Sequence, residues 1–397
     1  MMKKILILGG SFAQVPFIIE AKKRGYFTVL IDYLPENPGR ELVDEYYNCS
    51  TTDRDKVTEI ALQVRPDVVF SYASDPAAPV AAFVAEKLGL QCNSLQSIRL
   101  LTEKHLFREL QATNGFNCPK YMTVSDEGFN QFSVDEELAF PVIVKPTDAS
   151  GSKGVSRVDS LEELGAAIAT AAPFSRNRKI IVETFIDNEI ADVHGDGFVV
   201  EGQLVFHCLG DHLYGNESHP FNPTGTSWPS VVEEEAINRI IADVQEIITL
   251  SGFRNGAVNI EARIDGEGKH YIMEIGPRNG GHFVPSAVRY ASGFDSLAAC
   301  FDMLDQKNII FPTGKLTPSA YIALHSETEG TLKNITFCDK IKPFVRNFYQ
   351  YIPLGGKVRS FSAADAVIGI MLLTFTSQEE MACWLRHIKQ SIALEIA

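Results

Sequence analysis

The sequence predicts a protein of mixed α/β and α+β class in three parts. Three observations lead to this prediction. Short apolar runs alternate with helix-like segments over residues 1–94, two strand-like runs flank a turn at 257–282, and the composition shifts after residue 308. A chain of 397 residues has the length of two or three domains. We therefore expect domains at 1–94, 95–308 and 309–397.

The N-terminal part has the pattern of a parallel sheet covered by helices on both faces. This pattern is of Rossmann type, but the turn Gly9–Gln14 lacks the second and third glycines of the dinucleotide fingerprint. The missing glycines argue against nucleotide binding there. Substrate contacts are expected instead at the carboxyl ends of the strands, around Gly10–Ser11 and Ser74–Asp75. The expected strands are 3–8, 27–31 and 67–72, and the expected helices are 15–24, 53–64 and 77–88.

The middle part contains residue types that bind phosphate groups. Lys104 lies in a helix expected at 97–115, one turn before Arg108, and the two taken alone would form a solvated basic face. Lys145 follows an apolar strand at 140–144. The loop Ser150–Gly154 is rich in small residues, so its backbone N–H groups could close on phosphate oxygens, although it is not a Walker A loop. A flexible hairpin tip would have the same composition.

The region after residue 179 is expected to continue with strands at 179–183, 197–200 and 204–208. The tract Gly210–Ser230 is expected to be a cover loop, followed by a long helix to residue 250. His207, Asp211, His212 and His219 lie in or beside this tract. They lack the spacing of a structural zinc site, so we expect no metal there.

The stretch from Ala257 to His282 defines its own strand register. One register places its apolar residues on a single face and closes a four-residue loop at 266–269. The same register sets Glu261 opposite Glu274, and two like charges facing across a ladder are destabilising unless a cation lies between them. Two carboxylates with few other protein ligands suit Mg²⁺. A surface hairpin with scattered charges is the alternative. The apolar pairs of this register are Ile260–Ile275, Ala262–Met273 and Ile264–Tyr271.

The C-terminal part reads as a small α+β unit without a catalytic constellation. Strands are expected at 317–324, 347–352 and 367–374, and a helix at 377–393 carries one apolar stripe.

The composition disfavours several functions. The chain has 36 Lys and Arg against 50 Asp and Glu, a net charge of −14, which disfavours nonspecific binding to nucleic acid or to an anionic membrane. The longest apolar run, 366–375, is too short to span a bilayer, and the N-terminus reads as a buried strand rather than a signal peptide. Seven scattered cysteines without a CxxC motif make a disulfide framework unexpected and favour a cytoplasmic location.

The order of Lys104, Lys145 with its glycine loop, Glu183, and the Glu261/Glu274 hairpin with Arg278 resembles the ATP-grasp superfamily. More narrowly it resembles the carboxylate–amine ligases related to the carbamoyl-phosphate synthase large subunit, biotin carboxylase, phosphoribosylglycinamide synthetase and the dipeptide ligases. The resemblance covers essentially the whole chain. It implies a Rossmann-like pre-ATP-grasp domain, a two-part ATP-grasp domain with a lid at about 121–187, and a C-terminal cap.

The resemblance also implies roles in binding ATP. Lys104 and Lys145 would bind its phosphates, and Lys145 would also be catalytic. Glu183 would accept the adenine amino group and Glu189 would hold the ribose hydroxyls. The lid loop over the triphosphate would consist of Ser150, Gly151, Ser152, Lys153 and Gly154, and the rest of the adenine edge would contact the backbone of Thr184, Phe185 and Ile186.

The same resemblance implies the metal and transfer sites. Glu261 and Glu274 would hold Mg²⁺, with Mn²⁺ as a possible substitute, and Arg278 would stabilise the transferred phosphoryl group. Gly276 departs from the family pattern, because many relatives carry Asn there. Asn259, Asn279 or water would take the place of that ligand.

The implied activity is that of an ADP-forming carbon–nitrogen ligase. It would activate a small carboxylate as an acyl phosphate and couple it to an amine. The alternatives are a carboxylase that uses bicarbonate and a catalytically weak ATP-binding sensor. The acceptor pocket is expected among 210–230, 278–283 and the N-terminal strand ends, with His282 and Arg289 as candidate carboxylate contacts. The resemblance implies small-molecule carboxylate and amine substrates and allows a homodimer, and the identity of the substrates is left open.

Overall fold

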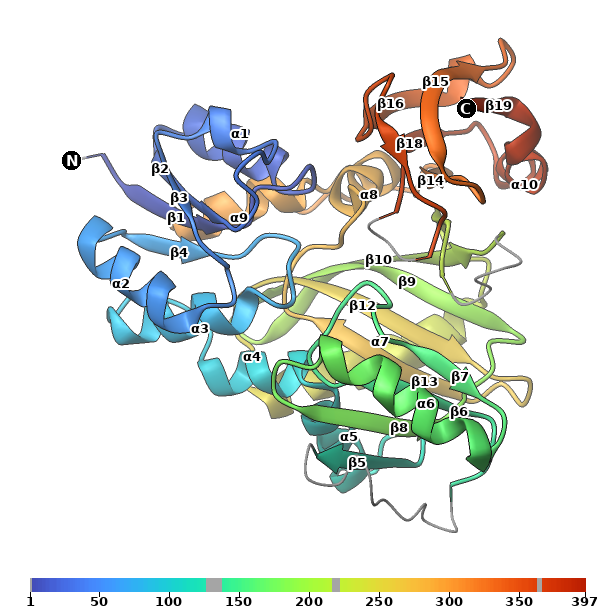
Figure 1. The fold of residues 1–397 in the computed structure, drawn as a ribbon, viewed down its shortest axis with the longest axis horizontal. Helices are drawn as coiled ribbons and strands as arrows, with labels where there is room; N and C mark the ends of the chain where they lie inside the picture. The colour runs from blue at the N-terminus through green and yellow to red at the C-terminus, as the bar shows by residue number, and fades with distance from the viewer. Residues whose placement is uncertain (1, 126–137, 216–221, 363–365) are drawn as a thin grey trace.

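The computed structural model describes residues 2–125, 138–215, 222–362 and 366–397. Four sheets organise these residues (Figure 1). The N-terminal layer lies at the upper left of Figure 1 and the C-terminal layer at the upper right, with the large central sheet and a smaller lid sheet below them. The predicted mixed α/β and α+β class is confirmed.

The N-terminal sheet is parallel, with strand order β3-β2-β1-β4, as the apolar runs predict. Both faces are covered because successive side chains of β1 point to opposite sides. Leu6 and Leu8 pack in one core with α2 and α3, and Ile5 and Ile7 pack in another with α1 and α9. The strands are β1 (Lys4–Leu8), β2 (Phe27–Asp32), β3 (Glu45–Asn48) and β4 (Val68–Phe70), and the helices are α1 (Val15–Lys23), α2 (Arg54–Val64), α3 (Ala78–Lys87) and α9 (Ser296–Leu304).

Two helices stand where the sequence predicts one. The chain breaks at Glu103, whose backbone is extended (φ −92°, ψ 107°), between α4 (Leu95–Thr102) and α5 (Lys104–Thr113). The break is reinforced when the Lys104 N–H, freed from the first helix, donates to the Thr147 carbonyl. Lys104 therefore begins a helix instead of lying within one.

The lid sheet is antiparallel, with strand order β5-β8-β6-β7. Its inner side chains pack against α6 in a separate core. The lid elements are β5 (Tyr121–Ser125), β6 (Val142–Pro146), β7 (Ser156–Val158), α6 (Leu161–Ala171) and β8 (Lys179–Thr184).

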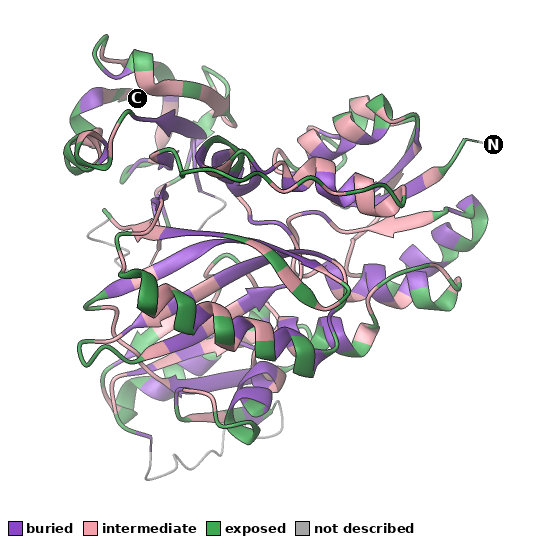
Figure 2. Ribbon diagram, turned by 180° about the vertical axis from the view of Figure 1, so that it is seen from behind, coloured by how far each residue is buried: buried purple, intermediate pink, exposed green. Residues whose placement is uncertain are grey.

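The central sheet has eight strands in the order β13-β12-β9-β10-β11-β14-β18-β16. Helix α7 (Glu234–Ser251) covers one face with Ile240, Val244, Ile247 and Ile248, which recur at helical spacing. Its outer face is exposed, as the view from behind shows (Figure 2). The strands are β9 (Ala191–Val200), β10 (Gln203–Leu213), β11 (Gly225–Trp228), β12 (Gly256–Ile264), β13 (His270–Gly276), β14 (Ser319–Leu324), β16 (Val345–Gln350) and β18 (Gly369–Thr374).

The expected cover loop at 210–230 is wrong in part. Strand β10 extends to Leu213 and β11 begins at Gly225, so that both ends of the tract belong to the sheet. Polar residues conceal the strands in the sequence because this face of the sheet lines a cavity instead of a core. His219 lies outside the described residues.

The C-terminal layer adds three strands to the central sheet and a small sheet of order β17-β15-β19. The expected helix at 377–393 is too long. Helix α10 (Gln378–Arg386) stops, and Ile392–Ile396 forms β19, which pairs with β15 (Gly330–Phe337). A stripe of apolar residues was continuous across this break because both elements face the same core. Strand β17 spans Lys357–Val358.

None of the helices in the described parts of the chain has the length and apolar character needed to cross a bilayer. Each of the seven cysteines is free, in agreement with the expected absence of disulfides.

Candidate active site

A cavity of about 410 Å³ lies between the lid sheet, the central sheet and the loop after β4. It brings together most of the residues that the sequence singles out. The predicted residues in its lining are Lys104, Lys145, Ser150, Gly151, Ser152, Lys153, Glu183, Phe185, Glu261, Glu274 and Arg278. Gly154, Thr184, Ile186 and Glu189 are not in the lining, and Glu189 is exposed beside the β12–β13 turn.

The predicted hairpin register is confirmed at the two carboxylates, but it is wrong between them and the turn. Ile260 pairs with Ile275 and Glu261 with Glu274, as predicted. The register then shifts, because a bulge places Met273 outside the pairing, and Ala262 lies opposite Ile272. Residue pairs closer to the turn, Arg263–Tyr271 and Ile264–His270, follow the shifted register. The bulge turns Met273 from the expected core face into the cavity.

The two facing carboxylates have unequal environments. Burial, and then the neighbouring Glu274, raise the pKa of Glu261 to about 7. Burial also acts to raise the pKa of Glu274, but Lys104, whose Nζ lies 3.4 Å from Oε2, and Arg278 outweigh it and lower that pKa. Lys104 is therefore paired with Glu274, whereas Glu261 has no such ion pair among the described residues. A divalent cation between them fits this donor set, as Mg²⁺ prefers carboxylate oxygens.

The position of Gly276 is crowded by the side chains of Asp75 and Arg278. A Cβ atom at Gly276 would lie 2.9 Å from Asp75 Oδ1 and 3.1 Å from Arg278 Cζ, so no side chain fits without displacing this pair. Of the two asparagines expected as substitutes, Asn259 pairs with Gly276 and lines the cavity. Asn279 is buried and donates to Ser296 Oγ instead.

Arg278 is held by a residue of the N-terminal domain. Its Nε and Nη2 donate to the two carboxylate oxygens of Asp75 at 2.8 and 2.5 Å, and Nη1 donates to the Asn279 carbonyl at 3.2 Å. Asp75 follows β4, where the sequence predicts substrate contacts at strand ends. The bidentate geometry orients the guanidinium toward the cavity. Gly10 and Ser11, the other expected contacts, are not in the lining of this cavity.

Arg108 is buried, and the expected solvated basic face is wrong. Its Nε donates to Glu183 Oε2 at 2.9 Å, and its Nη1 donates to Gln111 Oε1 at 2.8 Å and to the Met273 carbonyl at 3.0 Å. A carbonyl exposed by the bulge and a carboxylate from the lid therefore share one guanidinium. The periodicity of the helix cannot reveal these partners, which are distant in sequence.

Glu183, the expected acceptor for the adenine amino group, is paired on both oxygens. Lys145 Nζ lies 2.5 Å from Oε1 and Arg108 holds Oε2. Burial acts to raise the pKa of Glu183, but Arg108 and Lys145 outweigh it and lower the pKa to about 2. The carboxylate is therefore ionised and charge-compensated in this structure.

The backbone after Glu183 is partly engaged by the protein itself. The N–H groups of Thr184 and Phe185 donate to the Lys120 and Pro141 carbonyls, and the Ile186 carbonyl accepts from Arg263 Nη1 at 2.8 Å. The Phe185 ring lines the cavity. The adenine role of this segment is still a prediction.

The loop after β6 has the backbone of an anion-binding turn. Gly151, Ser152 and Gly154 have positive φ angles of 68°, 59° and 70°, and such turns point successive N–H groups to one side. Lys104 reaches the loop, with its Nζ 2.9 Å from the Ala149 carbonyl. A lysine and a turn rich in N–H groups thus face the same space.

The sequence reasoning missed His194 in the cavity lining, and it considered its stacking partner His212 only as a metal ligand. The rings of His194 and His212 lie 4.3 Å apart with 14° between their planes, and the Nδ1 atom of each is 3.0 Å from Thr226 Oγ1. Burial, first of all, lowers the pKa of both rings. Tyr321, which lies opposite Thr226 on the next strand, also lines the cavity and was missed. Alternating polar residues in β9 and β10 were the available signal.

The histidines and Glu261 lie close enough together to suggest a metal site, with candidate ligand atoms within 4.8 Å. Their geometry argues against one. A metal bound by two imidazoles lies in the plane of both rings, and nearly parallel stacked rings do not share such a point.

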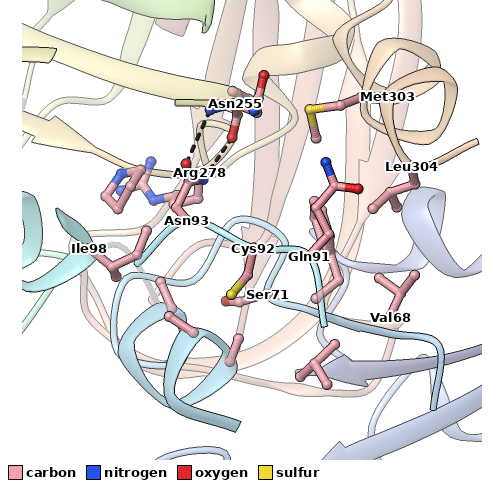
Figure 3. A pocket seen from close by; sticks show the side chains of 18 of the residues that line it. Val68, Ser71, Gln91, Cys92, Asn93, Ile98, Asn255, Arg278, Met303 and Leu304 are labelled. Atoms are coloured by element: carbon pink, nitrogen blue, oxygen red, sulfur yellow. Dashed lines mark hydrogen bonds between the residues drawn. The ribbon is translucent and has the colours of Figure 1, made fainter. Parts of the chain in front are cut away.

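His282 lines the cavity, whereas Arg289 lies outside it and pairs with Asp295 at 2.9 Å. A second cavity of about 230 Å³ shares Arg278 with the first among the described residues. Asn93 and Asn255 hydrogen bond to each other at its wall (Figure 3).

Comparison with known proteins agrees with this geometry. Residues 138–286 match the family described as the ATP-grasp domain. The carbamoyl phosphate synthase large chain of Thermotoga petrophila is 25% identical over 297 residues, which are 70% of this chain and 26% of that protein. The chain thus matches only about a quarter of the length of this relative.

Solved structures show the same fold. An L-amino acid ligase from Bacillus licheniformis aligns with a TM-score of 0.82 at 20% identity, over 100% of this chain and 99% of that one. The biotin carboxylase domain of a 2-oxoglutarate carboxylase from Hydrogenobacter thermophilus, solved with MgADP and bicarbonate, aligns with a TM-score of 0.77 at 16% identity, over 100% and 91% of the two chains. The resemblance to the ATP-grasp superfamily is confirmed, with the family match lying over residues 138–286.

Proposed function

We propose that this protein is an ATP- and Mg²⁺-dependent ligase that activates a small carboxylate as an acyl phosphate and couples it to an amine. ADP and phosphate are the other products. The observation that carries the proposal is that one cavity collects Lys104, Lys145, the glycine loop, the Glu261/Glu274 pair and Arg278. These are the groups that bind, neutralise and transfer a phosphoryl group.

The lysines and the glycine loop bind the triphosphate. In this structure Lys145 forms an ion pair with Glu183 and Lys104 with Glu274, each Nζ within 3.4 Å of a carboxylate oxygen. Anionic phosphates compete for these point charges. Glu261 and Glu274 would hold the metal ion, which would supply charge neutralisation for the transferring phosphoryl oxygens.

Arg278 binds the transferring phosphoryl group and the substrate carboxylate. Its guanidinium is already oriented by Asp75, so little reorganisation is needed when charge develops. The carboxylate oxygen attacks the γ-phosphorus and ADP leaves. The amine then attacks the acyl carbon, the C–O bond to phosphate breaks, and the proton of the amine passes to solvent or phosphate.

No protein nucleophile is required, in keeping with the composition of the cavity. Its described lining contains no cysteine, and its serines, Ser150 and Ser152, lie on the glycine loop. Catalysis rests on positioning, charge neutralisation and exclusion of water.

The test is ADP release measured over a matrix of small carboxylates and amines. ADP formation must depend on both. Hydroxylamine in place of the amine must trap the acyl phosphate as the hydroxamate of the substrate carboxylate. Release of AMP and pyrophosphate would contradict the proposal. Incorporation of labelled bicarbonate without another carboxylate would show a carboxylase instead.

A matched pair of variants tests the metal site. Glu274→Gln should abolish turnover, whereas Glu267→Gln, at an exposed position in the turn of the same hairpin, should leave it unchanged. Equal activity of the two variants would rule out the carboxylate pair as the metal site.

A further inference from the structure

A row of side chains crosses one face of the central sheet from the carboxylate pair toward the C-terminal layer. Directly opposite residues share a face, so Glu274 and Glu261 are followed by His194 on β9. The next strand places Gly210 opposite His194, and its i+2 neighbour His212 on the same face. The row then continues through Thr226 to Tyr321.

Gly210 leaves room for the stacked rings. It has no side chain opposite His194, so that His212 lies diagonally against the His194 ring at 4.3 Å. Thr226 holds both rings by their Nδ1 atoms, and the Nε2 of His194 faces the Asn259 amide at 3.0 Å. Both rings line the cavity. Stacking and these hydrogen bonds therefore fix the orientation of two planar rings in the cavity lining.

At the histidine end of the described cavity, each arginine of the lining is paired with an aspartate. The lining contains three lysines and two arginines. The lysines, Lys104, Lys145 and Lys153, lie at the glycine-loop end. Arg263 pairs with Asp192 at 3.2 Å, and Arg278 pairs with Asp75. The undescribed segments 126–137, 216–221 and 363–365 contain no lysine or arginine in the sequence.

We infer that the end of the cavity beyond Glu261 and Arg278 binds a planar, unsaturated, non-phosphorylated part of the carboxylate substrate, such as an aromatic or heteroaromatic side chain, against the stacked rings of His194 and His212. The inference rests on the proposed function for the position of the reacting carboxylate at Arg278. A phosphorylated side chain at this end would lie beside the carboxylates of Glu261 and Asp192, and both arginines of the lining are already compensated by aspartates. A planar ring gains from stacking on an imidazole face.

Binding can be measured whether or not the protein turns over. Isothermal titration of the protein loaded with ADP and Mg²⁺ would use L-tryptophan, L-leucine and O-phospho-L-serine as probes. Tryptophan should bind most tightly. Equal or tighter binding of leucine or phosphoserine would overturn the inference.

Two variants and a control separate ring contact from structural damage. His212→Ala should weaken tryptophan binding about 3- to 10-fold, the range of an aromatic pair, and leave leucine binding unchanged. His212→Phe keeps a planar ring and should restore most of the affinity. His207→Ala, on the same strand but exposed and outside the cavity lining, should change neither. An equal loss for all probes in His212→Ala, or no rescue by His212→Phe, would contradict the stacking contact.

Failure of the two proposals can be told apart. Suppose that tryptophan binds and that His212→Ala weakens its binding, but that no carboxylate releases ADP. The subsite would then be supported and the ligase activity refuted. Turnover with aliphatic acids alone would keep the ligase and refute the subsite.

Discussion

Arg108 and Glu183 form a fully buried ion pair, with Nε 2.9 Å from Oε2, that joins helix α5 to strand β8 of the lid sheet. Lys145 occupies the other oxygen of Glu183. If Lys145 moves to a phosphate, as we propose, Arg108 would still compensate the carboxylate. The pair would then let this lysine change partners without leaving a buried charge unpaired.

Arg108→Met should destabilise the fold strongly. It leaves Glu183 buried beside a single cation and removes the donor to the Met273 carbonyl, so we expect a loss of about 3–5 kcal/mol in the free energy of unfolding. Urea unfolding measures it. The double variant Arg108→Met/Glu183→Met should recover part of the loss, because the uncompensated charge is gone.

Arg99→Met serves as the matched control. Arg99 pairs with Glu103 at the surface, with half of its side chain exposed. Such pairs contribute about 0–1 kcal/mol. If both arginine variants cost the same, the Arg108 pair has no special stabilising role.

The same pair predicts a pH dependence of stability. The pKa of Glu183 is about 2 in the folded protein, below the ordinary value of 4.5. Folding therefore gains stability above about pH 4.5, and this gain is lost as the pH falls toward 2. It amounts to roughly 3 kcal/mol. Glu183→Gln should show a shallower decline in unfolding free energy between pH 4.5 and 2. An unchanged slope would assign the decline to other carboxylates.

Asp75→Asn should lower kcat more than it changes the KM for ATP. The variant weakens the contact that orients Arg278, and a misplaced catalytic group costs on the order of 10²-fold in rate. Steady-state kinetics on an active substrate pair gives both constants. Asp44→Asn, another hydrogen-bonded aspartate of the N-terminal domain but outside the cavity, is the control. An effect confined to KM would show that Asp75 acts in nucleotide binding.

Gly276→Asn should impair the enzyme, although asparagine is the residue that the ATP-grasp resemblance implies at this position. The new side chain would meet Asp75 and Arg278 at 2.9–3.1 Å from its Cβ and push the pair apart. We expect kcat to fall about as far as in Asp75→Asn, and the Mg²⁺ concentration needed for half-maximal activity should not decrease. Higher activity at low Mg²⁺ would instead show that the site lacks a ligand that asparagine can supply.

The sequence by itself determined the features that depend on residues close together in the chain. Glu261 and Glu274 face each other because their strands are consecutive and their apolar residues admit one pairing near Ile260 and Ile275. The alternation of strands and helices over 1–94 likewise follows from local patterns of apolar residues. Lys104, Lys145 and the glycine loop were recognisable as phosphate-binding types by composition and order.

Only the tertiary structure decided the contacts between distant segments. The bulge at Met273 is stabilised by Arg108, 165 residues earlier, and Arg278 is oriented by Asp75, 203 residues away. The stacked histidines depend on how β9, β10 and β11 align across the sheet. Hydrophobic periodicity records which face of a strand is buried, but not which polar residue of another segment meets it. Partner choice among polar residues is decided when the domains pack, and it is there that this cavity acquires its specific chemistry.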